Sequence, residues 1–198
     1  MGEATKSINY IKYNKKRYLF TIKWGEETDT CDTEGNVIKR SKKRPSYENI
    51  EIIVKKFFKG NIKQTPPQYS AVKINGVRAY KLARENIKVK LKKKEINIFN
   101  LSVKKPNNKN FCSFDLWCSS GTYVRSLARD ISKKLGTVGH AHEIIRIQDN
   151  VFKKTNASYL EKIIKLDITS MKKKLYPVDY VLDNIKIINV EKKYSDML

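Results

Sequence analysis

Two periodicities alternate along this sequence, and together they constrain the fold more than any other feature. Arg17 to Trp24 reads RYLFTIKW, in which Tyr18, Phe20 and Ile22 alternate with the intervening side chains, as is typical of a strand with one buried face. From residue 47 to residue 59, apolar residues recur at spacings of three and four, which indicates a helix that the glycine at position 60 would end. A chain that switches between these two periods predicts an α+β domain.

The remaining segments repeat both patterns. Strands are predicted at Glu95 to Val103 and at Asn110 to Trp117, on either side of a Pro-Asn-Asn loop, and a helix at Tyr123 to Leu135. The polar stretch Gly25 to Lys43 is long for a connection inside a compact domain and is expected to be functional or mobile. Shorter elements are predicted as follows: a helix at Gly2 to Tyr13, a strand at Tyr69 to Ile74 before an Asn-Gly turn, helical turns at Ala79 to Glu85, and a short strand followed by a helix at Ala157 to Leu166.

The charge of the chain points to a polyanionic partner. Lys and Arg number 42 against 20 Asp and Glu, a formal net charge of +22, and such an excess most often indicates nucleic acid. A second explanation stands beside this one: 34 of the 42 cations are lysines, and the codon usage of an AT-rich genome would raise surface lysine without selection for binding.

Several classes of protein are excluded. No apolar run approaches the roughly 20 residues that span a bilayer, and no signal-peptide pattern opens the chain. Cys31, Cys112 and Cys118 do not resemble a disulfide framework, so we expect a reducing compartment, most simply the cytoplasm. His140 and His142 have no further ligands nearby at zinc spacing, and we expect no metal.

Five stretches, taken in order, are specific. They read GEATK (Gly2 to Lys6), KRY (Lys16 to Tyr18), TDTCDTEGNV (Thr28 to Val37), YSAVKINGVRAYKLAR (Tyr69 to Arg84) and GTYVRSLARDI (Gly121 to Ile131). In this order they resemble the bacterial tRNA pseudouridine synthases of the TruB family. The resemblance covers roughly residues 2 to 166.

The resemblance implies a fold, a reaction and a partner. The fold would be the α+β pseudouridine synthase catalytic fold, with a mixed, mostly antiparallel central sheet flanked by helices and loops. The reaction would isomerise uridine 55 in the T-loop of tRNA by breaking the N1–C1′ bond and rejoining the base through C5, without cofactor or metal. The partner would be the T-arm of tRNA, and we expect a monomer that makes no contact with membranes.

The sequence also departs from the family pattern. Family members carry a nucleophilic aspartate in a loop shortly before the GEATK stretch, whereas here only Met1 precedes Gly2. Asp29, Asp32 and Asp130 lie in other matched motifs and are not substitutes. We therefore expect residues 2–170 to be a partial catalytic domain, residues 171–198 to be a tail leading toward a missing RNA-binding domain, and the chain alone to be inactive.

Three residues match catalytic positions of the family. Tyr18 matches the tyrosine that stacks on the target uracil, Arg125 the arginine that pairs with the catalytic aspartate, and Lys73 a lysine near the active site. The residues themselves leave alternatives open: a core tyrosine on a strand for Tyr18 and a solvated lysine for Lys73. An ordinary exposed arginine is a poorer explanation of Arg125, because a cation at a helix N-terminus opposes the macrodipole.

Five further residues are candidates for substrate or RNA binding. Tyr123 is expected beside the pocket, with core packing as the alternative, and Arg17 is expected to bind RNA next to Tyr18. Tyr80 and Arg84 are either structural or RNA-facing. Near Ile144-Ile145-Arg146 the family typically shows Leu-Arg-Arg, so Arg146 alone would carry any contact there.

Two other functions stay open at this point. A basic RNA-binding module or tRNA chaperone without catalysis would share the charge, and a start of the protein at Met1 with no preceding aspartate loop would favour it. The related guide-RNA-dependent synthase for ribosomal RNA is disfavoured by short loops and by the absence of its extensions.

Overall fold

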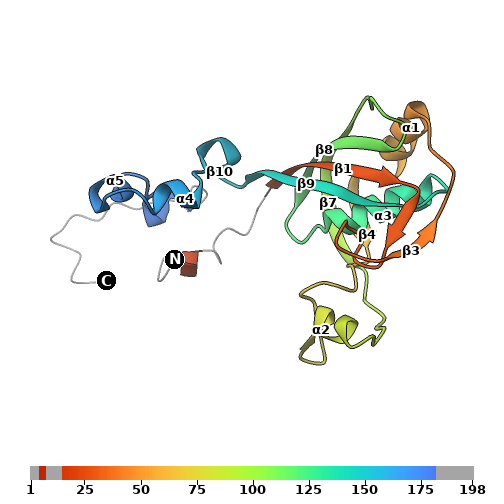
Figure 1. Ribbon diagram of the computed structural model, residues 1–198, viewed down its shortest axis with the longest axis horizontal. Helices are drawn as coiled ribbons and strands as arrows, with labels where there is room; N and C mark the ends of the chain where they lie inside the picture. Colours follow the sequence, from red (N-terminus) through yellow and green to blue (C-terminus); the bar gives the residue numbers. More distant parts are fainter. Residues whose placement is uncertain (1–4, 8–14, 182–198) are drawn as a thin grey trace. The chain divides into compact units, whose positions relative to one another are not determined.

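The computed structural model describes residues 5–7 and 15–181, and it divides into two units, residues 13–155 and residues 1–12 together with 156–198. The larger unit is built on a six-stranded sheet of order β10-β9-β1-β8-β7-β4, in which each neighbouring pair is antiparallel (Figure 1). The strands are β1 (Lys15–Trp24), β4 (Gly60–Gln64), β7 (Lys94–Lys104), β8 (Phe111–Ser119), β9 (Gly139–Asp149) and β10 (Phe152–Lys153). The expected α+β fold with a mostly antiparallel sheet is confirmed.

The predicted alternation of β1 sets its register within the sheet. Phe20, Ile22 and Trp24 are almost fully buried on one face, and Phe20 lies opposite Phe114 of β8 with the two rings stacked 4.9 Å apart. A slip of one residue would turn all of these side chains to the other face, so burial fixes the pairing.

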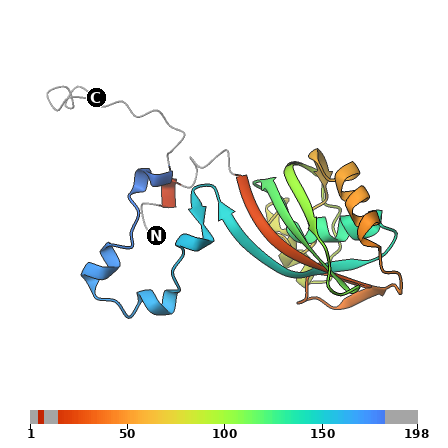
Figure 2. The same cartoon turned by 90° about the horizontal axis from the view of Figure 1, so that it is seen from above.

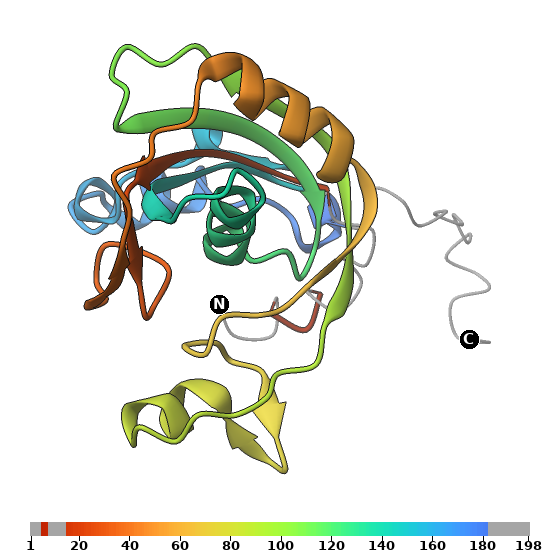
Figure 3. The same cartoon turned by 90° about the vertical axis from the view of Figure 1, so that its right-hand side faces the viewer.

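Two helices cover this core face. Helices α1 (Tyr47–Phe57) and α3 (Val124–Lys134) lie on the same side of the sheet, to its right in Figure 2 and toward the viewer in Figure 3. The side chain of Ser46 accepts a hydrogen bond from the Asn49 amide and starts α1, as an N-cap serine does. Gly60, predicted to end this helix, has φ +73° and turns the chain directly into β4.

The remaining elements of the larger unit project from the sheet. The expected functional or mobile stretch between residues 25 and 43 is an ordered hairpin of β2 (Glu26–Thr28) and β3 (Val37–Arg40). An arm carries β5 (Lys73–Ile74), β6 (Val77–Arg78) and α2 (Ala79–Arg84), and Figure 3 shows it extending away from the sheet. Asn75 and Gly76 both have positive φ, so the predicted Asn-Gly turn is confirmed.

The smaller unit contains short helices. They are α4 (Leu160–Ile163), α5 (Ile168–Lys172), and 3-10 turns at residues 5–7 and Val178–Val181, while a further 3-10 turn, Lys154–Asn156, includes the boundary between the two units. The predicted helix at Ala157 to Leu166 shortens to α4, because Leu160 and Ile164 are 70% and 64% exposed and little packing supports a longer helix. The predicted helix at Gly2 to Tyr13 lies largely outside the described residues, and the domain boundary near residue 170 stays a prediction. None of the helices described here is both long and apolar enough to cross a membrane.

Candidate active site

Arg125 is held in place by three hydrogen bonds. It lies in the first turn of α3, where its Nη1 donates to Asp32 Oδ2 at 2.9 Å and to the Thr30 carbonyl at 3.3 Å, and its Nη2 donates to the Tyr69 carbonyl at 3.1 Å. The Asp32 carboxylate offsets both the arginine charge and the positive end of the helix dipole, which removes the conflict expected for a cation at this position. A guanidinium has five N–H donors, so these three bonds leave donors for a further anion. Only one of the three acceptors is charged.

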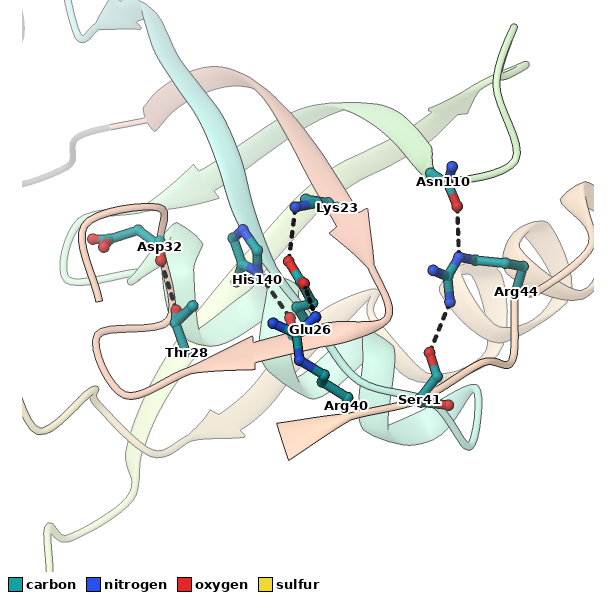
Figure 4. A network of polar contacts seen from close by, with 9 residues as sticks. All are labelled: Lys23, Glu26, Thr28, Asp32, Arg40, Ser41, Arg44, Asn110 and His140. Carbon is teal, nitrogen blue, oxygen red and sulfur yellow. Dashed lines mark hydrogen bonds and ion pairs between the residues drawn. The ribbon is translucent and has the colours of Figure 1, made fainter. Parts of the chain in front are cut away.

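Asp32 is itself fixed by the loop that carries it. Its Oδ1 accepts hydrogen bonds from the Thr30 hydroxyl at 2.6 Å and from the Glu34 amide at 3.1 Å, and its carbonyl accepts one from the Thr28 hydroxyl at 2.6 Å. Figure 4 shows the bond between Thr28 and Asp32 at the end of the β2–β3 hairpin. The sequence excluded Asp32 as a nucleophile but did not reveal its pairing with Arg125.

Tyr123 precedes α3 and is locked through its backbone. The Gln64 side chain donates from Nε2 to the Tyr123 carbonyl at 3.1 Å and accepts at Oε1 from the Tyr123 amide at 2.9 Å. Tyr123 occupies the N-cap position of α3, and its own side chain does not cap the helix. The Gln64 side chain, which comes from β4, instead accepts a hydrogen bond from the Tyr123 amide at this end of the helix. The start of α3, and with it Arg125, is thereby fixed to β4.

Tyr18 lies on the core face of β1, the same face that α3 covers. The ring is half-buried, and burial raises the pKa of its phenol, whereas the nearby Arg146 guanidinium pulls that pKa down. Arg146 lies opposite Tyr18 on β9, and Ile145 lies opposite Leu19 on the other face. The isoleucine that replaces a family arginine therefore points away from the Tyr18 face, and Arg146 is the residue that reaches it.

The other predicted residues lie elsewhere. The Arg17 side chain lies on the face of the sheet opposite Tyr18. There its guanidinium donates two hydrogen bonds, of 2.9 and 2.6 Å, to the Asp115 carboxylate and lies 5.4 Å from the centre of the Trp117 ring. Lys73 is exposed on the arm, and there the Arg84 guanidinium lies 5.5 Å from the Tyr80 ring. The structure thus separates the candidates into three groups: the core-face group of Tyr18, Tyr123, Arg125 and Arg146, the arm group of Lys73, Tyr80 and Arg84, and Arg17 on the opposite face.

The remaining reactive side chains pack within the fold. His140 is buried and hydrogen-bonds through Nδ1 to the Glu26 carbonyl at 2.8 Å, whereas His142 contacts the Phe111 ring. Within residues 5–7 and 15–181, no three His, Cys, Asp or Glu side chains gather as metal ligands. Cys112 and Cys118 are buried on the core face of β8 as unpaired thiols, as their spacing predicts.

Comparison with known proteins shows which proteins this chain is similar to. The profile described as "TruB family pseudouridylate synthase (N terminal domain)" matches residues 1–124. A tRNA pseudouridine synthase B from Ehrlichia canis (strain Jake) is 42% identical over 193 residues, which are 96% of this chain and 63% of that protein. The protein of the same name from Rickettsia bellii (strain OSU 85-389) is 36% identical over 199 residues, 100% of this chain and 68% of that protein.

The solved structures agree on the fold. A chain in the crystal structure of a Cbf5-Nop10-Gar1 complex superposes with a TM-score of 0.63 at 19% identity, covering 89% of this chain and 46% of that one. The fold is the pseudouridine synthase catalytic fold. The chain belongs to the TruB family of pseudouridylate synthases, and it spans about half to two thirds of the length of the curated relatives that it matches.

Proposed function

We propose that this chain forms part of a tRNA pseudouridine synthase that isomerises uridine 55 in the T-loop of tRNA. The observation that carries the proposal is the Arg125 guanidinium, which is fixed by Asp32 and two carbonyls at the start of α3, the helix that covers the face of the sheet bearing Tyr18. The TruB relatives at 36–42% identity, all named tRNA pseudouridine synthase B, favour tRNA as the substrate.

Each residue of the core-face group has a distinct task in this proposal. The target base must leave its stack, at a cost of a few kcal/mol, and the half-buried Tyr18 ring offers a flat surface on which it can stack. Arg125 suits a carboxylate because its fork binds both oxygens and its proton is never lost at neutral pH. The resemblance places that carboxylate, the nucleophilic aspartate, in a loop before the GEATK stretch, of which Gly2, Glu3 and Ala4 lie outside the described residues.

The arm group serves the RNA in this proposal. Lys73 and Arg84 place cations on the arm, where Tyr80 adds an aromatic surface for stacking. Arg17 has its charge balanced by Asp115, so its main contribution is to hold β1 and β8 together beneath Tyr18. The isomerisation breaks and remakes bonds within one nucleotide and needs no redox group or metal.

The experiment supplies the aspartate loop. The segment that precedes the GEATK stretch in the Rickettsia bellii relative is fused before Gly2, and pseudouridine formed in unmodified tRNA is measured by carbodiimide labelling. The fusion should turn over tRNA, whereas the chain as printed should bind tRNA without turnover. Equal turnover by both would show that the assignment of the aspartate is wrong, and binding without turnover by a folded fusion would favour a non-catalytic RNA-binding module.

A second variant tests the role of the tyrosine. In the active fusion, Tyr18→Ala should reduce turnover far more than tRNA affinity, because stacking stabilises the flipped base and not the docked tRNA. Tyr18→Phe keeps the ring and is the matched control. Loss of the fold or of affinity alone in Tyr18→Ala would instead support a core-packing role for Tyr18.

A further inference from the structure

A basic pocket lies at the opposite end of β1 from Tyr18. Lys23, in β1, alternates to the face away from the core and lies opposite Phe111 of β8. Both residues line a pocket of about 540 Å³ that is completed by the β2–β3 hairpin and by the segment that follows it. Five residues along a strand place Lys23 about 17 Å from Tyr18, so this pocket is separate from the candidate active site.

Arg44 forms one wall of the pocket and is held in a single orientation. Its Nε donates to Asn110 Oδ1 at 2.8 Å, and its Nη1 donates to the carbonyls of Ser41 at 2.9 Å and of Lys43 at 3.3 Å. All three acceptors are neutral, so they orient the guanidinium without balancing its charge. Figure 4 shows the third nitrogen, Nη2, directed away from Asn110 and Ser41 and toward the side where Glu26 lies.

The backbone at Gly25 allows this wall to form. Gly25 has φ +96°, and any side chain there would collide with the Arg44 guanidinium. The Ser41 amide donates to the Gly25 carbonyl at 2.9 Å, which closes the hairpin base against the arginine. The arginine is therefore packed against bare backbone and is preorganised before any ligand arrives.

The pocket carries an excess of cations. Lys23 Nζ lies 2.7 Å from Glu26 Oε2, and Arg40 bonds the other oxygen of the same carboxylate. The hydrogen bond from Lys23 lowers the pKa of Glu26, which therefore stays ionised at neutral pH. Lys42 and Arg44 add two further positive charges, so the residues that line the pocket include four cations and one carboxylate.

We propose that this pocket binds a phosphate of the RNA backbone, at a point on the substrate remote from the nucleotide that reaches Tyr18. The Nη2 group of Arg44, which none of these bonds uses, can donate to a phosphate oxygen, and Arg40 and Lys42 add positive charge at the rim. The identity of the ligand as RNA rests on the proposed function, whereas the anion site rests on the pocket alone.

The test measures the salt dependence of tRNA binding by the full chain. A double variant, Arg40→Gln with Lys42→Ala, removes two rim charges and leaves Arg44 in place. The matched control, Lys39→Ala with Lys55→Ala, removes two exposed charges that do not line the pocket, one of them on the same strand as Arg40. Thermal unfolding should show that both double variants keep the fold.

One phosphate contact contributes about 0.7–0.9 to the slope of log affinity against log salt, so the pocket variant should lose up to about 0.7–0.9 from the slope and the control almost none. Equal slopes in the two variants would overturn the pocket while leaving the proposed function intact. A wild-type chain whose tRNA affinity does not respond to salt would overturn both.

A second measurement locates the anion on the protein. The NMR signal of the Arg44 Nε–H group should shift on addition of tRNA and of inorganic diphosphate, because both present phosphate oxygens to the same guanidinium. A shift with diphosphate alone would show that the pocket takes small anions and would overturn the RNA assignment. No shift with either ligand would overturn the site.

Discussion

Replacing Gln64 by alanine should loosen the start of α3 and with it the position of Arg125. Gln64 is 2% exposed, and its amide group is the partner that joins β4 to the backbone of Tyr123. The Tyr123 carbonyl keeps a second donor, the Leu127 amide at 3.0 Å, but the Tyr123 amide would lose its bond to the Gln64 side chain. The variant therefore costs one lost hydrogen bond and one buried, unpaired N–H group.

The magnitude follows from those two losses. A lost hydrogen bond costs about 1 kcal/mol, and an unsatisfied buried donor costs about 1–3 kcal/mol, so Gln64→Ala should lower the free energy of unfolding by about 2–4 kcal/mol. For a domain of this length, 1 kcal/mol shifts Tm by about 2–4 °C, so Tm should fall by about 4–16 °C.

Urea unfolding separates hydrogen bonding from packing. Gln64→Leu keeps most of the side-chain volume but none of the hydrogen bonds, and it should be nearly as unstable as Gln64→Ala. Gln68→Ala is the control, because Gln68 is half-buried and makes one side-chain bond, to the Val89 carbonyl at 2.8 Å. A Gln64→Leu variant as stable as the wild type would refute the reasoning, because the side chain would then act only by filling space.

Three further changes test other parts of the fold. The hydrogen bonds from Arg17 lower the pKa of Asp115, so this carboxylate stabilises the fold above its unfolded pKa near 4, and this stability is lost as the pH falls through the lower folded value. Asp115→Asn should therefore lower the free energy of unfolding by about 1 kcal/mol at neutral pH, measured by urea unfolding. A cost that persists at pH 2 would contradict this explanation. Burial raises the pKa of Cys112 to about 12 and that of Cys118 to about 11, so a thiol reagent at pH 8 should label neither until urea is added, and rapid labelling of the folded chain would argue against burial. Asp32→Asn leaves the Arg125 guanidinium with neutral acceptors only and should lower the free energy of unfolding by about 1–3 kcal/mol. An unchanged midpoint of urea unfolding would show that the ion pair does not stabilise the fold.

The elements with a clean period were predictable from the sequence alone. β1, β7, β8 and α3 each bury one face, so their apolar residues repeat regularly, and the predicted bounds differ from the observed ones by only a few residues. β4 was missed because its sequence, GNIKQ, contains residues with weak strand preference and gains its order from pairing with β7. The short strand that was predicted, without bounds, ahead of Ala157 corresponds to β9, which spans 11 residues and whose alternation is interrupted by bulges at two points.

The candidate site was only partly predictable for a different reason. Arg125 and Tyr18 could be chosen because they lie in specific motifs, but no local pattern relates Arg125 to Asp32, which is 93 positions away. Contacts of this kind depend on how the hairpin loop packs against the start of α3. The same holds for Gln64, which a sequence reading treats as an ordinary polar residue at the end of an unpredicted strand.

The β2–β3 hairpin explains why a polar stretch without a core of its own is ordered. Asp32 in its loop binds Arg125, and the Ala141 amide of β9 donates to the Cys31 carbonyl at 3.0 Å, so the loop is anchored to two other elements. At its base, Glu26 holds Lys23 and Arg40 beside the basic pocket. The charges of this stretch are therefore partly structural, because Asp32 fixes Arg125 and Glu26 fixes Lys23 and Arg40. Net charge describes such a segment poorly, since the pairing of each carboxylate determines which cations stay available for a ligand.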